Sequence, residues 1–160
     1  MPLIFNRSLI KSAGASEPEV DNRTIVTMTG RSVSNSNIVI KPASFTIVQD
    51  PGGLISGSAI GDANARYLPL YNGTYTFQIT GFSSSSFSVS SNWKIGVGYY
   101  NAPNGFSVWG DGFTYYPGTT LTAPSSTKSI TITGSNGYRG LFYEGSSSPG
   151  SVPSVTIAFE

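Results

Sequence analysis

The sequence of 160 residues contains no cysteine and no histidine. Without cysteine the fold has no disulfide, and neither thiol chemistry nor a cysteine-type zinc site is possible. Without histidine the chain lacks the side chain whose ordinary pKa best suits acid–base catalysis near neutral pH, and Ser-His-Asp and Cys-His triads are excluded. Most of the usual parts of an active site are missing, so we expect the protein not to be an enzyme.

Charge is also scarce: charged residues make up 11% of the chain, and the formal net charge is +1. The nine basic residues are scattered singly, so there is no basic stripe to contact phosphates, and we expect no nucleic-acid partner. The eight carboxylates show no calcium-loop spacing, and we expect no metal and no cofactor. A glycosidase would need two carboxylates facing each other across a cleft, and the candidates are Asp62, Asp111 and Glu144.

Long apolar runs are the third absence. No run approaches the roughly 20 residues that span a bilayer, so we expect no membrane insertion. The apolar patch within residues 3–10 is too short for a secretory signal peptide, so we expect a soluble chain without an export address. It is followed by SAGASEPEVD, a segment of small and polar residues. We therefore expect residues 1–22 to form a flexible N-terminal arm and residues 23–160 to form a single domain.

From Thr24 onward the chain contains short runs of alternating apolar and polar residues, separated by turn residues, which is typical of half-buried β-strands. In GTYTFQITG (73–81), Tyr75, Phe77 and Ile79 should face a core while the intervening residues face water. No stretch of ten or more residues keeps helical spacing. We expect nine to eleven strands, in segments that include TIVTMT (24–29), NIVIKP (37–42), SFTIVQ (44–49), WKIGVGYY (93–100), KSITITG (128–134) and SVTIAFE (154–160).

Many short antiparallel strands must either stack as two sheets or close on themselves, because a single open sheet would leave one apolar face in water. We therefore predict an all-β fold, an antiparallel β-sandwich with jelly-roll topology. The segment Asp50-Pro51-Gly52-Gly53 should form a turn after one of its strands.

The richest aromatic stretch is NAPNGFSVWGDGFTYYPG, residues 101–118. Asp111-Gly112 predicts a two-residue hairpin turn, with Phe106 and Phe113 in the buried row of that hairpin. Two interpretations stay open: the aromatic rings fill a core, or some of them form a platform on which a sugar ring stacks while amides and a carboxylate bind its hydroxyls. The candidate ligand-binding residues are Trp109, Tyr116, Tyr99, Tyr100, Asn101, Asn104 and Asp111.

The chain combines low charge, abundant Ser, Thr, Gly and Tyr, nearly all-β patterning and an N-terminal arm. In this combination it resembles the small β-sandwich structural proteins of bacteriophage and viral particles, which serve as capsid decorations, spikes or fibre heads. GTYTFQITG and SVTIAFE are similar in texture to strands of such trimeric heads. The resemblance implies a virion protein that acts in particle assembly or host-surface attachment. It also implies a homo-oligomer, with a trimer favoured, contacts with other capsid proteins through residues 1–20, and host surface glycans as a ligand.

The alternative is a carbohydrate-binding module or lectin-like domain with an extracellular location. A third interpretation is an accessory β-domain of a larger secreted enzyme. Packaging of RNA is not expected, because Arg7 and Lys11 are too few basic residues for a packaging arm.

Overall fold

The structure is a computed structural model of the chain. It describes residues 17–30, 32–33, 39–61, 66–84, 93–101, 106–133, 138–146 and 153–160. Of these, residues 32–33, 39–41, 60–61, 66, 99–101, 106–110, 138–139 and 144–146 are described by their backbone alone. These ranges contain twelve strands, and none of them includes a helix that could cross a membrane.

The first sheet has five strands in the order β10-β7-β12-β1-β4, and its strand pairs are antiparallel. Its middle is built from the pairing of β12 with both β1 and β7, and β4 and β10 form its two edges. The bounds are β1 (Thr24–Thr29), β4 (Ser44–Gln49), β7 (Gly73–Phe82), β10 (Lys128–Ile132) and β12 (Val155–Phe159).

The second sheet has seven strands centred on β11. On one side β11 pairs with β8, which in turn pairs with β9, and on the other it pairs with β6 and β3 over two residues each. The two shortest strands, β2 and β5, pair with β3 and β6. The bounds are β2 (Ser32–Val33), β3 (Val39–Lys41), β5 (Ile60–Gly61), β6 (Arg66–Pro69), β8 (Trp93–Asn101), β9 (Phe106–Tyr115) and β11 (Tyr138–Ser146).

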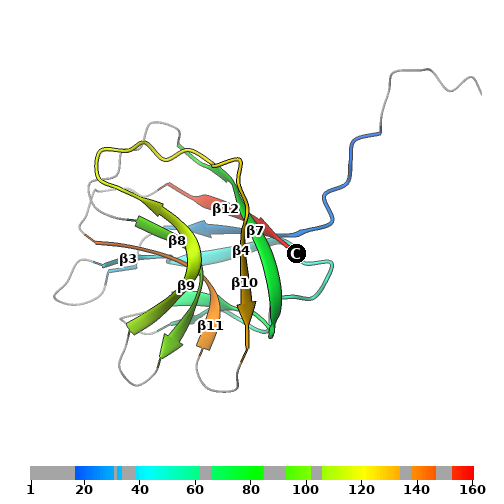
Figure 1. Cartoon of the computed structure of the whole chain (residues 1–160), viewed down its shortest axis with the longest axis horizontal. Coiled ribbons are helices and arrows are strands. Elements are labelled where there is room, and N and C mark those ends of the chain that lie inside the picture. The colour runs from blue at the N-terminus through cyan, green and yellow to red at the C-terminus, as the bar shows by residue number, and fades with distance from the viewer. Residues whose placement is uncertain are drawn as a thin grey trace, which may run out of the picture.

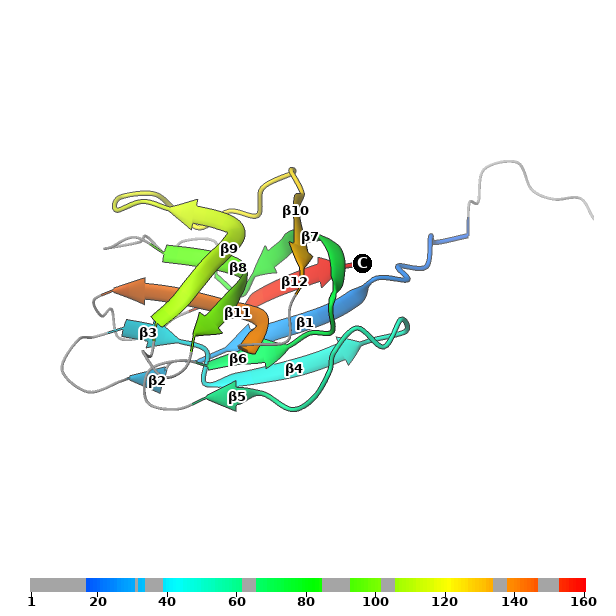
Figure 2. The same cartoon turned by 60° about the horizontal axis from the view of Figure 1, so that its bottom comes forward.

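The two antiparallel sheets pack together, and the predicted β-sandwich is confirmed (Figures 1 and 2). The jelly-roll topology stays a prediction. Twelve strands exceed the nine to eleven expected, because β2 and β5 have only two residues each and carry too little pattern to be recognised in a sequence.

The core lies between the sheets and takes side chains from both. In β7 the predicted alternation is confirmed, since Tyr75, Phe77 and Ile79 are buried. Phe77 meets Phe113 of β9 edge to face, with ring centroids 6.0 Å apart and an interplanar angle of 88°. Edge-to-face pairs of this kind add to the free energy gained by burying apolar area. The ring contact therefore joins the two sheets.

One local prediction is wrong. Asp111 and Gly112 lie inside β9, opposite Val97 and Gly96 of β8, and do not form a hairpin turn. The strands β8 and β9 pair as far as Asn101 and Phe106, so the connection between them comprises residues 102–105. A Cβ atom added at Gly96 would lie 2.4 Å from the carbonyl oxygen of Asp111, so glycine at this point allows the two backbones to approach closely.

The predicted turn after β4 is confirmed. The Gly53 amide donates a hydrogen bond to the Asp50 carbonyl at 3.2 Å, and Gly53 has a φ of 63°. This left-handed conformation favours glycine because it has no Cβ atom.

Candidate functional site

The candidate ligand residues lie mainly on the neighbouring strands β8 and β9. Tyr99, Tyr100 and Asn101 end β8, and the backbone of Trp109 in β9 lies opposite Gly98. The structure thus brings these four positions together in the sheet, although it describes them by their backbone alone. Asn104 lies outside the described residues, and the proposed sugar contacts of these side chains stay a prediction.

Tyr116 follows the end of β9 and is 61% exposed. Its carbonyl accepts hydrogen bonds from the Thr119 amide at 3.1 Å and from the Thr119 hydroxyl at 2.6 Å. Its backbone is therefore held in a turn that includes Gly118, with a φ of 84°. The exposed ring meets one requirement of a stacking platform.

The residues before Tyr116 face a different environment. Phe113 is buried, as predicted for the core row, and the Tyr115 hydroxyl donates to the Thr122 carbonyl at 2.9 Å. Burial raises the pKa of Tyr115 to about 12, so its hydroxyl stays protonated at neutral pH. Asp111 is half-buried, and its Oδ1 accepts the Gly112 amide at 2.8 Å. This end of the strand combines a packed row with the exposed Tyr116.

The carboxylate pair considered for a glycosidase stays a hypothesis. Asp62 lies outside the described residues, and Glu144 is described by its backbone alone. Within the part of the chain that the structure describes, no three His, Cys, Asp or Glu side chains group closely enough to hold a metal ion.

A second candidate surface, which the sequence did not reveal, is the edge strand β4. It pairs with β1, and among the described residues no strand pairs with its other side, which is the free edge of the first sheet. Ile47 and Val48 are 48% and 59% exposed. The strand reads SFTIVQ and contains no charge and no proline, the residues that usually protect an edge strand from pairing with another chain.

Ile47 is exposed although it faces the inner side of the sandwich. Its cross-strand partner is Val26, and Phe45 is opposite Met28. Val26 and Met28 are fully buried, and cross-strand partners share a face of a sheet. Ile47 therefore points toward the core side, where a hollow of about 530 Å³ leaves it uncovered. The hollow is lined by Phe45, Ile47, Asp50, Ile55, Gly57, Ser58, Ala59 and Leu68.

Asp50 supports one wall of this hollow. Its Oδ1 accepts hydrogen bonds from the Thr24 hydroxyl at 2.8 Å and the Leu54 amide at 2.9 Å, and its Oδ2 accepts the Ile55 amide at 3.2 Å. Partial burial alone would raise the pKa of Asp50, but the hydrogen bonds to its charged form outweigh burial and lower it. The segment that contains Ile55 is in this way fastened to β1 and β4.

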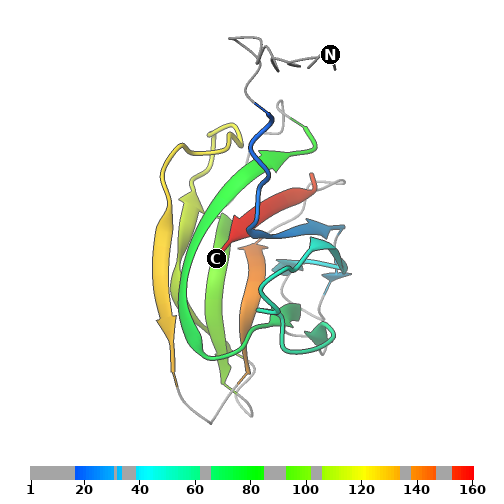
Figure 3. The same cartoon turned by 90° about the vertical axis from the view of Figure 1, so that its right-hand side faces the viewer.

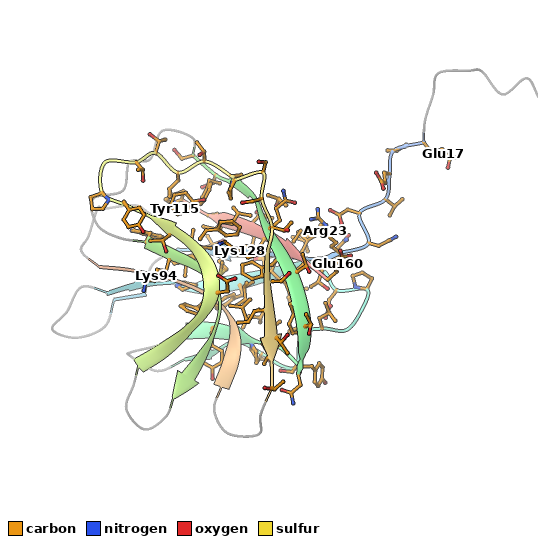
Figure 4. All side chains as sticks on the ribbon, viewed as in Figure 1. Glu17, Arg23, Lys94, Tyr115, Lys128 and Glu160 are labelled. Carbon is orange, nitrogen blue, oxygen red and sulfur yellow. The ribbon has the colours of Figure 1, made fainter. Side chains whose placement is uncertain are left out.

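The arm leaves the sandwich next to the end of β4. Gln49 donates a hydrogen bond from Nε2 to the Arg23 carbonyl at 2.7 Å, and Arg23 donates from Nη1 to Gln78 at 3.1 Å. Arg23 also forms an ion pair with Asp21, in which Nη2 lies 2.7 Å from Oδ2. The hydrogen bonds from Arg23 to the Asp21 carboxylate lower the pKa of Asp21 from 3.8 to about 2. Residues 17–22 are exposed and lead away from the sheets (Figures 1 and 3). Arg23 lies at the sandwich, whereas Glu17 lies well away from it (Figure 4).

The described residues define an antiparallel two-sheet β-sandwich, with exposed residues 17–22 that lead away from it and an edge strand, β4, next to their base. Comparison of the chain with protein-family models, with curated proteins and with solved structures found no match.

Proposed function

We propose that this protein is a non-enzymatic structural protein of a virus particle, either a capsid decoration, a spike or a fibre head. It acts in particle assembly or in attachment to the host surface. The observation that carries the proposal is the arm, because residues 17–22 are exposed, lead away from the sandwich and are anchored at their base by Arg23. A segment held in this way is suited to contact a neighbouring subunit. The disulfide-free sandwich and the low charge support the same function.

The protein is proposed to work as a homo-oligomer, with a trimer favoured. A surface that carries few charges offers little repulsion between copies, and closed symmetric oligomers are the common outcome when identical chains associate. Light scattering of the purified full chain at tens of micromolar should give the mass of three copies. A monomer at this concentration would contradict the oligomer.

The particle location is tested in the organism that encodes the chain. Particles are banded by density-gradient centrifugation and probed with an antibody against the protein. We expect the chain in the particle band, and we expect deletion of residues 1–20 to remove it from the band without unfolding the sandwich. If the intact chain stays entirely with the free proteins, the virion function is wrong.

The alternative, a carbohydrate-binding domain, is favoured by the exposed ring of Tyr116. A glycan array tests it with Tyr116→Ala and, as a matched control, Tyr71→Ala, because Tyr71 is 56% exposed on another segment. A sugar platform requires that the first variant lose binding and that the second keep it. Absence of binding by the intact chain to any glycan would remove this alternative.

A further inference from the structure

We propose that the free edge of β4 is a docking site for the N-terminal arm of a second copy of this chain. Residues 3–10 of one copy add an extended strand to β4 of the next, and their apolar side chains enter the hollow beside Ile47. The inference rests on the proposed function, in which residues 1–20 contact a neighbouring particle subunit, and it identifies that neighbour as another copy.

The first argument is that β4 has the properties of a strand that accepts another. Its outer side offers backbone N–H and C=O groups along the residues Ser44–Gln49, and strand addition gains affinity from such groups. The opposite edge of the same sheet, β10, carries Lys128, and a charged side chain of this kind hinders pairing. The unprotected edge of this sheet is therefore β4.

The second argument is the hollow, whose lining includes four apolar side chains. Phe45, Ile47, Ile55 and Leu68 line it together with three small residues, and Ile47 remains 48% exposed on the inner side of the sheet. An incoming strand at the edge would project every second side chain toward the same inner side. Covering Ile47 and Ile55 with apolar groups removes their surface from water, which is favourable at roughly 25 cal/mol per Å².

The third argument is the sequence of the arm. In PLIFNRSLI (2–10), alternate positions place Leu3, Phe5, Arg7 and Leu9 on one face of an extended strand. Leu3 and Phe5 suit the apolar lining. Arg7 lies on the same face, and Asp50 is the single carboxylate among the residues that line the hollow. The apolar and charged positions of the arm thus match the character of the site.

The direction of the arm selects a second copy as the partner. Arg23 and Gln49 hold the base of the arm at the end of β4, and residues 17–22 lead away from the sandwich (Figures 2 and 3). Sixteen further residues precede Glu17, and a segment of this length can span about 50 Å when extended. The arm is therefore long enough to reach a neighbouring body, and exchange of identical segments is a low-cost route to closed oligomers.

The test places a photo-crosslinking benzoylphenylalanine at Phe5 of the full chain. Equal amounts of ¹⁵N-labelled and unlabelled protein are mixed, illuminated and digested, and the crosslinked peptides are identified by mass spectrometry. We expect crosslinks from position 5 to residues 44–59 that join a labelled to an unlabelled chain. Crosslinks within one chain, crosslinks to another region, or no crosslink between copies would each overturn the proposal.

A matched pair of variants gives a second measurement. Ile47→Lys puts a charge into the hollow and should lower the crosslink yield at least tenfold and shift the mass toward that of the monomer. Tyr71→Lys, at a similarly exposed position outside β4 and outside the lining of the hollow, should leave both unchanged. Circular dichroism verifies that each variant is folded. An unchanged yield in folded Ile47→Lys would contradict the docking site.

The outcomes for the inference and for the proposed function can be told apart. A chain that bands with particles but shows no crosslink between copies at β4 retains the virion function and loses the docking site. If the chain crosslinks at β4 but never bands with particles, the arm exchange exists but the protein has another function. That result overturns the inference as stated for a particle subunit.

Discussion

At the scale of single residues, we expect substitutions of Phe113 and Tyr116 to have different effects on stability, although the two residues are close in the chain. Phe113 is buried and meets Phe77 across the sheets, whereas Tyr116 is 61% exposed. We expect Phe113→Ala to lower the free energy of unfolding by about 3–5 kcal/mol, because it leaves a cavity in the core. Tyr116→Ala should change it by about 0.5 kcal/mol or less. Urea denaturation of both variants measures the difference, and equal losses would contradict the assigned environments.

Asp50 connects β1, β4 and the segment beyond them through its carboxylate. In Asp50→Asn one carboxylate oxygen becomes an NH₂ group. If the NH₂ group replaces Oδ2, it faces the Ile55 amide, which is also a donor. If it replaces Oδ1, it faces the Leu54 amide, and the Thr24 hydroxyl loses its acceptor. We expect a loss of about 1–2 kcal/mol in the free energy of unfolding, measured by urea denaturation at pH 7. Ser58→Ala, at an exposed position in the same segment, is the control and should have little effect.

The pH dependence of Asp50 has a definite sign. Its pKa is lowered in the folded protein, so the charged form stabilises the fold above the ordinary value of 3.8. This contribution is lost as the pH falls through the lowered folded pKa. Urea denaturation between pH 7 and pH 2 should therefore show the difference between the intact chain and Asp50→Asn shrinking in the acid range. A difference that grows below pH 3.8 would contradict the lowered pKa.

At the scale of strands, glycine decides where two backbones can pair closely. A Cβ atom at Gly140 of β11 would lie 1.9 Å from the Leu68 carbonyl oxygen of β6, and backbone cannot move aside as a flexible side chain can. We expect Gly140→Ala to cost about 3 kcal/mol or more in unfolding free energy, at or above the upper end of overpacking effects. Gly81→Ala in β7 is the control, because nothing lies within 4 Å of the added methyl group. Thermal and urea unfolding compare the two.

The hairpin prediction failed at this same scale. Asp-Gly is a strong turn signal when only neighbours in the chain are considered. In the sheet, Gly112 pairs with Gly96, and β8 and β9 continue past this point to Asn101 and Phe106. The pairing of two long strands outweighs the local preference of one dipeptide, and a sequence pattern does not reveal which strand will lie opposite.

At the scale of the whole molecule, the sandwich and the arm should differ in their resistance to protease. Glu19 is exposed, and the described strands begin only at Thr24. Limited digestion with a glutamate-specific protease should first cut after Glu19 and leave a resistant product of residues 20–160. Mass spectrometry identifies the first product. A first cut inside the sandwich, with the bond after Glu19 intact, would contradict the assigned boundary.

The sequence alone determined the fold class and much of the core of this protein. Period-two alternation in the segments 24–29, 44–49 and 73–81 predicted strands β1, β4 and β7. The alternation arises because successive side chains of a strand point to opposite faces of the sheet. The buried positions of β7 and the turn at Asp50 to Gly53 followed from the same local rules. Such features depend on residues a few positions apart, so a sequence contains them.

The tertiary structure decided which strands pair and which one is left at an edge. The alternation in SFTIVQ places Ile47 on the same face as Phe45. The exposure of Ile47 depends on the position of β4 as the last described strand of its sheet and on the hollow beside Ile55 and Leu68. Glycine is likewise required at positions 96 and 140 because the backbone of another strand lies too close for a Cβ atom. Strand order arises from contacts between residues far apart in sequence, whose free energy is shared over the whole core. No local pattern encodes it.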